Sequence, residues 1–192
     1  MTDRQTLRRD MRDARTTFVQ SLSPAVRRAL EAALARQLAP HIAGARILGS
    51  YAALNSEIDP QSAEQHCTAA LAFPRAQPDT ALTFHATPSA GLVPGYRGIM
   101  EPAADATPLR PDMLLVPLLA ADRHGNRLGQ GGGHYDRTLT ALRASGPLIA
   151  IGIGWDIQLR SEIPAEPWDA PLDALATPTA FHWCRPAAMA QG

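Results

Sequence analysis

The sequence contains no lysine. All 18 of its basic residues are arginine, and 18 acidic residues balance them, so the formal net charge at pH 7 is zero. A chain with this balance lacks the broad positive field that holds a nucleic acid. We interpret the missing lysine as a codon-composition bias. We expect no nucleic-acid partner; RNA binding through the N-terminal arginines is a distant alternative.

Long apolar runs and paired cysteines are also missing. No run approaches the roughly 18 apolar residues that span a bilayer, and the N-terminal segment 1–15 is charged where a signal peptide needs an apolar core. The two cysteines, Cys67 and Cys184, have neither the spacing of a zinc site nor the density of a disulfide scaffold. We therefore expect a cytoplasmic protein with no membrane partner.

The composition is that of a folded protein. Hydrophobic residues make up 45% of the 192 residues and charged residues 19%, which is typical of a globular chain of one-domain size. We expect one domain over residues 1–186, a frayed Ala-rich tail over 187–192, and a monomer.

Periodic apolar residues predict two helices at the start of the chain. Leu7, Met11 and Phe18 recur at helical spacing within 4–19, and the pair Ser23-Pro24 starts a second helix that reaches Pro40. Further along, the pattern predicts strands over 46–53, 71–73, 81–85, 113–119 and 148–154, with helices over 63–71 and 134–144. Strands that alternate with helices favour an α/β fold with a Rossmann-like, open and mostly parallel sheet flanked by helices.

The segment 122–137, DRHGNRLGQGGGHYDR, is the most informative in the chain. It carries glycines at 129, 131, 132 and 133 between a predicted buried strand and a predicted helix. Such a loop exposes backbone N–H groups beside a helix N-terminus, which suits polyphosphate oxygens, and Arg127 and Arg137 could grip the same phosphates. The spacing fits neither a Walker loop nor a dinucleotide fingerprint. Taken alone, the loop therefore predicts phosphate binding but no particular reaction.

Asp136 stands out because a carboxylate beside a phosphate loop should repel the ligand. Mg²⁺ removes this conflict, since it binds carboxylates and nucleotide oxygens together. The alternative is that Asp136 only stabilises a helix N-terminus, an effect of about 0.3–1 kcal/mol.

The motif HGNRLGQGGGHYDR at 124–137 resembles the signature of the 5-formyltetrahydrofolate cyclo-ligase family. Further similar segments occur in the same order: RQTLRRDMRDAR at 4–15, YAALNSEIDP at 51–60, FPR at 73–75, IMEP at 99–102 and WDAPLDALATPTA at 168–180. The resemblance implies that ATP and Mg²⁺ are used to convert 5-formyltetrahydrofolate, or its polyglutamylated forms, into 5,10-methenyltetrahydrofolate with release of ADP and phosphate. It further implies phosphorylation of the formyl oxygen and attack by N10.

The resemblance also assigns candidate site residues. The ATP contacts that it implies are Arg4, Arg8, Arg127, Leu128, Gly129, Gln130, Gly131, Gly132, Gly133, His134 and Tyr135. The substrate contacts are Leu54, Glu57, Met100, Gly133 and Tyr135, and the metal ligands are Asp136 and Asp169. Arg127 and Tyr135 are the candidate catalytic residues.

The N-terminal arginines extend the predicted phosphate site. Arg4, Arg8, Arg12 and Arg15 lie on one side of the first predicted helix, so several of them could face one polyphosphate; a solvated cationic face is the alternative. Family members usually carry Lys where Arg4 stands.

Two departures from the family pattern, His134 and Trp155, could reshape the pocket. Two other functions stay open: an isomerase or transferase with a similar phosphate loop, and a nucleotide-binding module without catalysis.

Overall fold

The computed structural model describes residues 3–95 and 98–184, so the tail predicted for 187–192 lies outside the described residues. Its helices are α1 (Arg4–Ser21), α2 (Pro24–Ile42), α3 (Gln61–Glu64) and α4 (His134–Ala144), with 3-10 turns η1 (Ser89–Gly91) and η3 (Asp156–Gln158). The strands are β1 (Ile47–Gly49), β2 (Ala70–Arg75), β3 (Thr83–Ala86), β4 (Val93–Pro94), β5 (Met100–Glu101), β6 (Met113–Pro117), β7 (Ala120–Ala121), β8 (Arg127–Leu128), β9 (Ile149–Ile153), β10 (Ala174–Ala176) and β11 (Phe181–Trp183).

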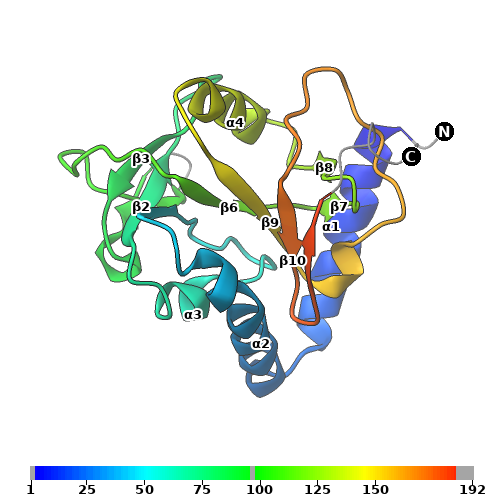
Figure 1. The fold of residues 1–192 in the computed structure, drawn as a ribbon. Helices are drawn as coiled ribbons and strands as arrows, with labels where there is room; N and C mark the ends of the chain where they lie inside the picture. The colour runs from blue at the N-terminus through cyan, green and yellow to red at the C-terminus, as the bar shows by residue number, and fades with distance from the viewer. Residues whose placement is uncertain (1–2, 96–97, 185–192) are drawn as a thin grey trace.

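A seven-stranded sheet forms the centre of the molecule, in the order β11-β10-β9-β6-β1-β2-β3 (Figure 1). The five inner strands run parallel to one another, whereas β11 and β3 pair antiparallel at the two edges of the sheet. The prediction of a mostly parallel α/β sheet is therefore confirmed.

Alternation along β6 explains why helices cover both faces of the sheet. Met113 and Leu115 belong to the apolar cluster that contains Leu34 and Leu38 of α2, whereas Leu114 and Val116 belong to the cluster that contains residues of α4. Side chains two apart on a strand point to the same face, so this buried strand contributes to two cores. Figure 1 shows α2 and α4 on opposite sides of β6.

The N-terminal half of helix α1 packs against the hairpin formed by β7 and β8, whereas Phe18 and Val19 near its other end pack on the core that contains α2. Met11 joins Leu119 and Leu128 in a third apolar cluster. The carboxylate of Asp3 caps the helix by accepting hydrogen bonds from the backbone amides of residues 5 and 6. This packing brings the cationic side of α1 next to the loop that follows β8.

Several predicted boundaries were wrong. The helix predicted for 63–71 is a single turn, α3, because 70–72 instead pair with β1. The strand predicted for 46–53 is limited to Ile47–Gly49, where the parallel ladder ends. The sequence patterns also missed β10, β11 and the β7–β8 hairpin. No helix among the described residues is long and apolar enough to cross a bilayer.

Candidate functional site

A large cavity lies at the carboxyl ends of the parallel strands, where ligands of open α/β sheets bind. Its volume is about 1300 Å³. Tyr51 after β1, Ala76 after β2 and Leu118 after β6 line it on the sheet side. The glycine loop, the N-terminal part of α1 and the segment 166–169 complete the wall.

The glycine loop, residues 129–133, connects β8 to α4. Gly131 and Gly133 have φ values of +105° and +64°, a region that other residues seldom adopt. Gly133 is also the N-cap of α4, so no side chain caps the first turn of this helix. Unlike the predicted arrangement, the loop does not follow the central strand directly, because the β7–β8 hairpin stands between them.

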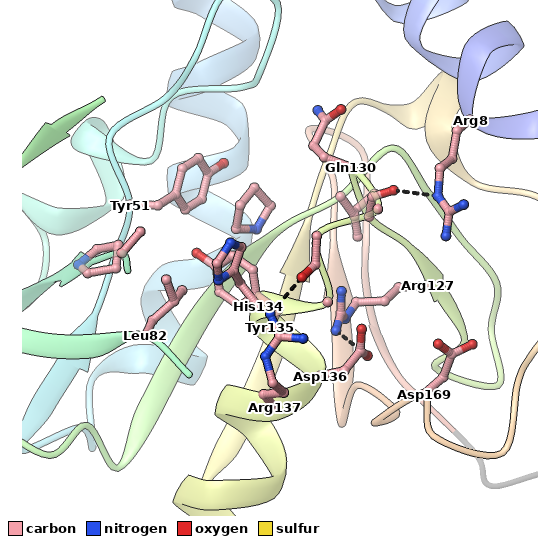
Figure 2. Close-up of a pocket in the computed structure, with 18 of the residues that line it drawn as sticks. Arg8, Tyr51, Leu82, Arg127, Gln130, His134, Tyr135, Asp136, Arg137 and Asp169 are labelled. Carbon is pink, nitrogen blue, oxygen red and sulfur yellow. Dashed lines mark hydrogen bonds and ion pairs between the residues drawn. The ribbon is translucent and has the colours of Figure 1, made fainter. Parts of the chain in front are cut away.

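Two arginines fix the loop from its two sides. The Arg8 Nε donates a hydrogen bond of 3.2 Å to the Gly129 carbonyl, and the Arg137 Nη2 donates one of 2.7 Å to the Gly132 carbonyl. Figure 2 shows Arg8 reaching toward the loop from α1. The two side chains that hold the loop in shape are therefore both cationic, and their charge is opposite to that of a phosphate group.

Arg127 and Asp136 form an ion pair on the cavity wall. Their Nη2 and Oδ1 atoms are 2.6 Å apart, and the side chains are 4% and 22% exposed (Figure 2). Burial lowers the pKa of Arg127, and Asp136 opposes that effect. The Asp136 Oδ1 also accepts a hydrogen bond from the Ala170 amide, and the Arg127 guanidinium lies 5.8 Å from the centre of the Tyr135 ring.

Asp169 forms a second ion pair in the same cavity. Its Oδ2 lies 2.5 Å from the Arg4 Nη1, which also donates to the Pro164 carbonyl. Within residues 3–95 and 98–184, no cluster of three or more His, Cys, Asp or Glu side chains could hold a metal ion. Mg²⁺ commonly uses one or two carboxylates together with substrate phosphates. Asp136 and Asp169 fit that pattern in the donors that they offer.

Glu57 also lines the cavity and is only 7% exposed. Its Oε2 accepts a hydrogen bond of 3.0 Å from the Leu54 amide, and its Oε1 is 3.6 Å from the Arg15 Nη1. Burial raises the pKa of Glu57, while the Leu54 amide and Arg15 oppose the shift. Leu54 and Met100 are exposed apolar side chains that line the cavity nearby.

The family comparison adds to this geometry. The family model for 5-formyltetrahydrofolate cyclo-ligases matches residues 1–178. The chain belongs to this family. The 5-formyltetrahydrofolate cyclo-ligase of Escherichia coli (strain K12) is 39% identical over 107 residues, which are 53% of this chain and 57% of that protein. The one of Mycolicibacterium smegmatis is 43% identical over 91 residues, or 45% and 46%. The alignments thus span about half the length of these curated relatives.

Two solved structures agree with this family assignment. The NMR structure of Aquifex aeolicus 5,10-methenyltetrahydrofolate synthetase superposes with a TM-score of 0.74 at 26% identity and covers 93% of both chains. A 5,10-methenyltetrahydrofolate synthetase from Mycoplasma pneumoniae gives 0.70 at 20% identity, covering 92% of this chain and 99% of that one, and shows the shared fold.

Nearly all of the residues predicted for the site line one cavity in this family member. The lining includes Arg4, Arg8, Leu54, Glu57, Met100, Arg127, Gly129, Gln130, Gly131, Gly132, Gly133, His134, Tyr135, Asp136 and Asp169. Leu128 differs, because its side chain is fully buried against α1 and only its main chain is near the loop.

The arginine row of α1 does not behave as one phosphate-binding face. Arg4 and Arg8 line the cavity, whereas the exposed Arg12 donates to the Gln130 side chain and Arg15 is buried beside Glu57. The row was predicted from helical spacing, and spacing cannot show that the last arginine meets a buried carboxylate from another segment.

Residues outside the prediction also contribute to the cavity. Tyr51 lines it while its hydroxyl donates to the Ile58 carbonyl at 2.7 Å, and Trp168 lines it with a side chain that is 71% exposed. The helical and strand patterns carried no signal for either one. Trp155 is fully buried and lies outside the cavity lining, so it would influence the pocket indirectly, through its hydrogen bond to the Ser56 carbonyl and through the buried cluster that it shares with Tyr51.

Proposed function

We propose that this protein is an ATP- and Mg²⁺-dependent 5-formyltetrahydrofolate cyclo-ligase that produces 5,10-methenyltetrahydrofolate, ADP and phosphate. The observation that carries the proposal is that the glycine loop, its arginines and the buried Glu57 line one cavity. Membership of the family supports the same activity.

The reaction needs two substrates held close together. The formyl oxygen attacks the γ-phosphorus of ATP, and the bond from that phosphorus to the ADP oxygen breaks. N10 of the folate then attacks the activated formyl carbon, the C–O bond to phosphate breaks, and N10 loses its proton. Ring closure within one molecule gains most from positioning, because the reacting atoms need no further encounter.

The nucleotide end of the cavity contains the groups that this transfer needs. We assign the ATP phosphates to the free amides at the start of α4, to the glycine loop and to Arg4 and Arg8. Arg127 would stabilise charge on the transferred phosphoryl group once phosphate competes with Asp136 for its guanidinium. Tyr135 would hold the Arg127 guanidinium over its ring.

The proposed magnesium ligands are Asp136 and Asp169. Bound Mg²⁺ would neutralise phosphate charge and hold the oxygens of the triphosphate in place. In the structure, both carboxylates form ion pairs with arginines. They would become available to a cation when phosphate binds those arginines instead. Nucleotide and metal are therefore expected to favour each other's binding.

The folate end would recognise the pterin ring by its N–H donors. An ionised Glu57 accepts hydrogen bonds and cannot donate them, which matches this ring edge. Leu54, Met100 and Tyr135 would provide apolar contact. We include polyglutamylated forms of the substrate in the proposal because the protein is rich in surface arginine.

We also propose a monomeric enzyme with one domain. The cavity lining extends along the chain from residue 3 to residue 169, so one copy supplies all of the proposed ligands.

The test is the absorbance of the methenyl product when purified protein is mixed with 5-formyltetrahydrofolate, ATP and Mg²⁺. We expect the signal to grow only when both ATP and Mg²⁺ are present. Folded protein that binds ATP without turnover would instead indicate a nucleotide-binding module. Turnover that needs no ATP would contradict the proposed chemistry and favour an isomerase or transferase.

A further inference from the structure

Arg15 is the most buried arginine of α1, with 4% of its surface exposed. Its Nε donates a hydrogen bond of 3.1 Å to the Ser56 hydroxyl, and its Nη1 donates one of 3.3 Å to the Leu118 carbonyl. The same Nη1 lies 3.6 Å from the Glu57 carboxylate. Arg15 is not part of the cavity lining, whereas Glu57 is. The arginine therefore stands behind the carboxylate, on the side away from the ligand.

The main chain around Glu57 is held by other groups. The Glu57 amide donates to the Leu54 carbonyl at 2.9 Å, the Trp155 Nε1 donates to the Ser56 carbonyl at 2.9 Å, and the Arg27 Nη2 donates to the Glu57 carbonyl at 3.0 Å. These three bonds hold the main chain of the loop and do not involve Arg15, which adds its hydrogen bond to the Ser56 hydroxyl. The particular contribution of Arg15 is thus a positive charge at the back of the Glu57 carboxylate.

That charge matters because Glu57 is buried. Desolvation raises the pKa of the carboxyl group, and the nearby Leu54 amide, Arg15 and the Gln130 side chain oppose it. The other ionisable side chains that face this carboxylate are Tyr51 and Tyr135, and burial raises the pKa of both phenols. Neither tyrosine can supply positive charge.

Arg27 of α2 also lies near Glu57, but its guanidinium pairs with Glu31 at 2.9 Å and its side chain is 31% exposed. Arg12 lies beside the pair of Arg15 and Glu57, one turn away on the same helix. It acts on Arg15 by repulsion and hydrogen-bonds to the Gln130 side chain. It is exposed, so solvent screens its charge. Arg15 is therefore the buried cation closest to Glu57 among the described residues.

We propose that Arg15 is a positioning residue that keeps Glu57 ionised and directed at the folate, and that it is not a phosphate ligand. This inference rests on the proposed function. A protonated Glu57 would carry a donor where the pterin also offers donors, so folate binding would weaken while nucleotide binding would not. The arginine row of α1 then serves both substrates, with Arg4 and Arg8 at the nucleotide and Arg15 behind the folate contact.

The test is the Kd of 5-formyltetrahydrofolate for R15Q, R15K and wild type between pH 6 and pH 9, with the Kd of ATP measured in parallel. An opposite charge within about 4–6 Å lowers a carboxyl pKa by about 1–3 units, so R15Q should weaken folate binding about tenfold or more near neutral pH. The loss should shrink as pH rises and Glu57 ionises. R15K, which keeps the charge, should follow the wild-type pH profile, and ATP binding should change less than about twofold in both variants.

Arg9 on the same helix provides the matched control. Its side chain is 68% exposed and, among the described residues, forms an ion pair only with the adjacent Asp10, so R9Q should resemble wild type for both ligands. A loss in R15Q that is equal at every pH, or that extends to ATP, would overturn the role of Arg15. Wild-type protein that binds no 5-formyltetrahydrofolate would overturn the proposed substrate and this role with it.

A double variant covers the case in which R15Q does not fold, because it leaves no buried carboxylate without a partner. E57Q and R15Q/E57Q should bind 5-formyltetrahydrofolate with equal Kd and little dependence on pH between 6 and 9. A further tenfold loss in the double variant would show that Arg15 acts on the ligand by a route other than Glu57.

Discussion

The Asp136→Asn substitution tests the assignment of the nucleotide end most directly. Asparagine has nearly the shape of aspartate and keeps an oxygen that can accept from Arg127 and from the Ala170 amide, so the change removes mainly the negative charge. Arg127, 4% exposed, then loses its ion-pair partner and keeps only the weaker attraction of Asp169 among the described residues. Removing one partner of a buried ion pair costs about 3–5 kcal/mol.

Partial access of water to Asp136, which is 22% exposed, reduces that cost. We expect the free energy of unfolding to fall by about 2–3 kcal/mol. For a chain of this length that corresponds to a decrease in Tm of roughly 5–10 °C. Denaturant unfolding and calorimetry measure both quantities. Asp10→Asn, at an exposed pair, is the control and should stay within about 0.5 kcal/mol of wild type.

Ligand binding separates this role from simple stability. Without Mg²⁺, ATP should bind D136N at least as tightly as wild type, because a carboxylate that repels phosphate and competes for Arg127 is gone. With Mg²⁺, the wild type should gain affinity and D136N should gain much less. An unfolding free energy equal to that of wild type, together with a full Mg²⁺ effect, would refute the reasoning for Asp136.

Substitutions at three further positions test other parts of the site. Gly133→Ala places a Cβ at φ +64°, 2.9 Å from the Arg137 Nη1, and should cost about 1–2 kcal/mol and weaken ATP binding; Gly44→Ala, which meets no atom within 4 Å, is the control for unfolding. Glu57→Gln should raise the Kd of 5-formyltetrahydrofolate about tenfold or more with little effect on ATP, and equal losses for both ligands would contradict its assignment. Arg4→Lys should keep ATP affinity within about threefold because the charge remains, whereas Arg4→Met should lose about tenfold or more; titrations with ATP decide this, and equal behaviour of the two would remove Arg4 from the phosphate site.

Local sequence patterns predicted the elements whose structure depends on near neighbours. The helix over 134–144 has the predicted bounds, and α1 and α2 extend two residues beyond the predicted ends at Val19 and Pro40. Capping by Ser23 and the apolar spacing of α2 are local features, so a sequence pattern can register them. The apolar run 113–119 likewise identified the central strand, which spans Met113–Pro117 in the structure.

The missed elements depend on partners that are distant in the chain. The segment 63–71 has helical spacing, yet α3 is a single turn that ends at Glu64. Residues 70–72 pair with β1 in the parallel sheet instead. The two-residue strands β7 and β8 exist because they pair with each other over the apolar side of α1. No short window of sequence contains the pairing with β1 or the packing of the hairpin against α1.

By itself, the sequence determined the alternating α/β pattern, the family motif and the glycine loop, because each is written in residues adjacent along the chain. Only the tertiary structure decided which charges meet. It paired Asp136 with Arg127 and Asp169 with Arg4. It also placed Arg15, one of the four arginines predicted to face phosphate, beside the buried Glu57 carboxylate. The physical reason is that an ion pair depends on distance in space and on exclusion of water, and packing between remote segments sets both.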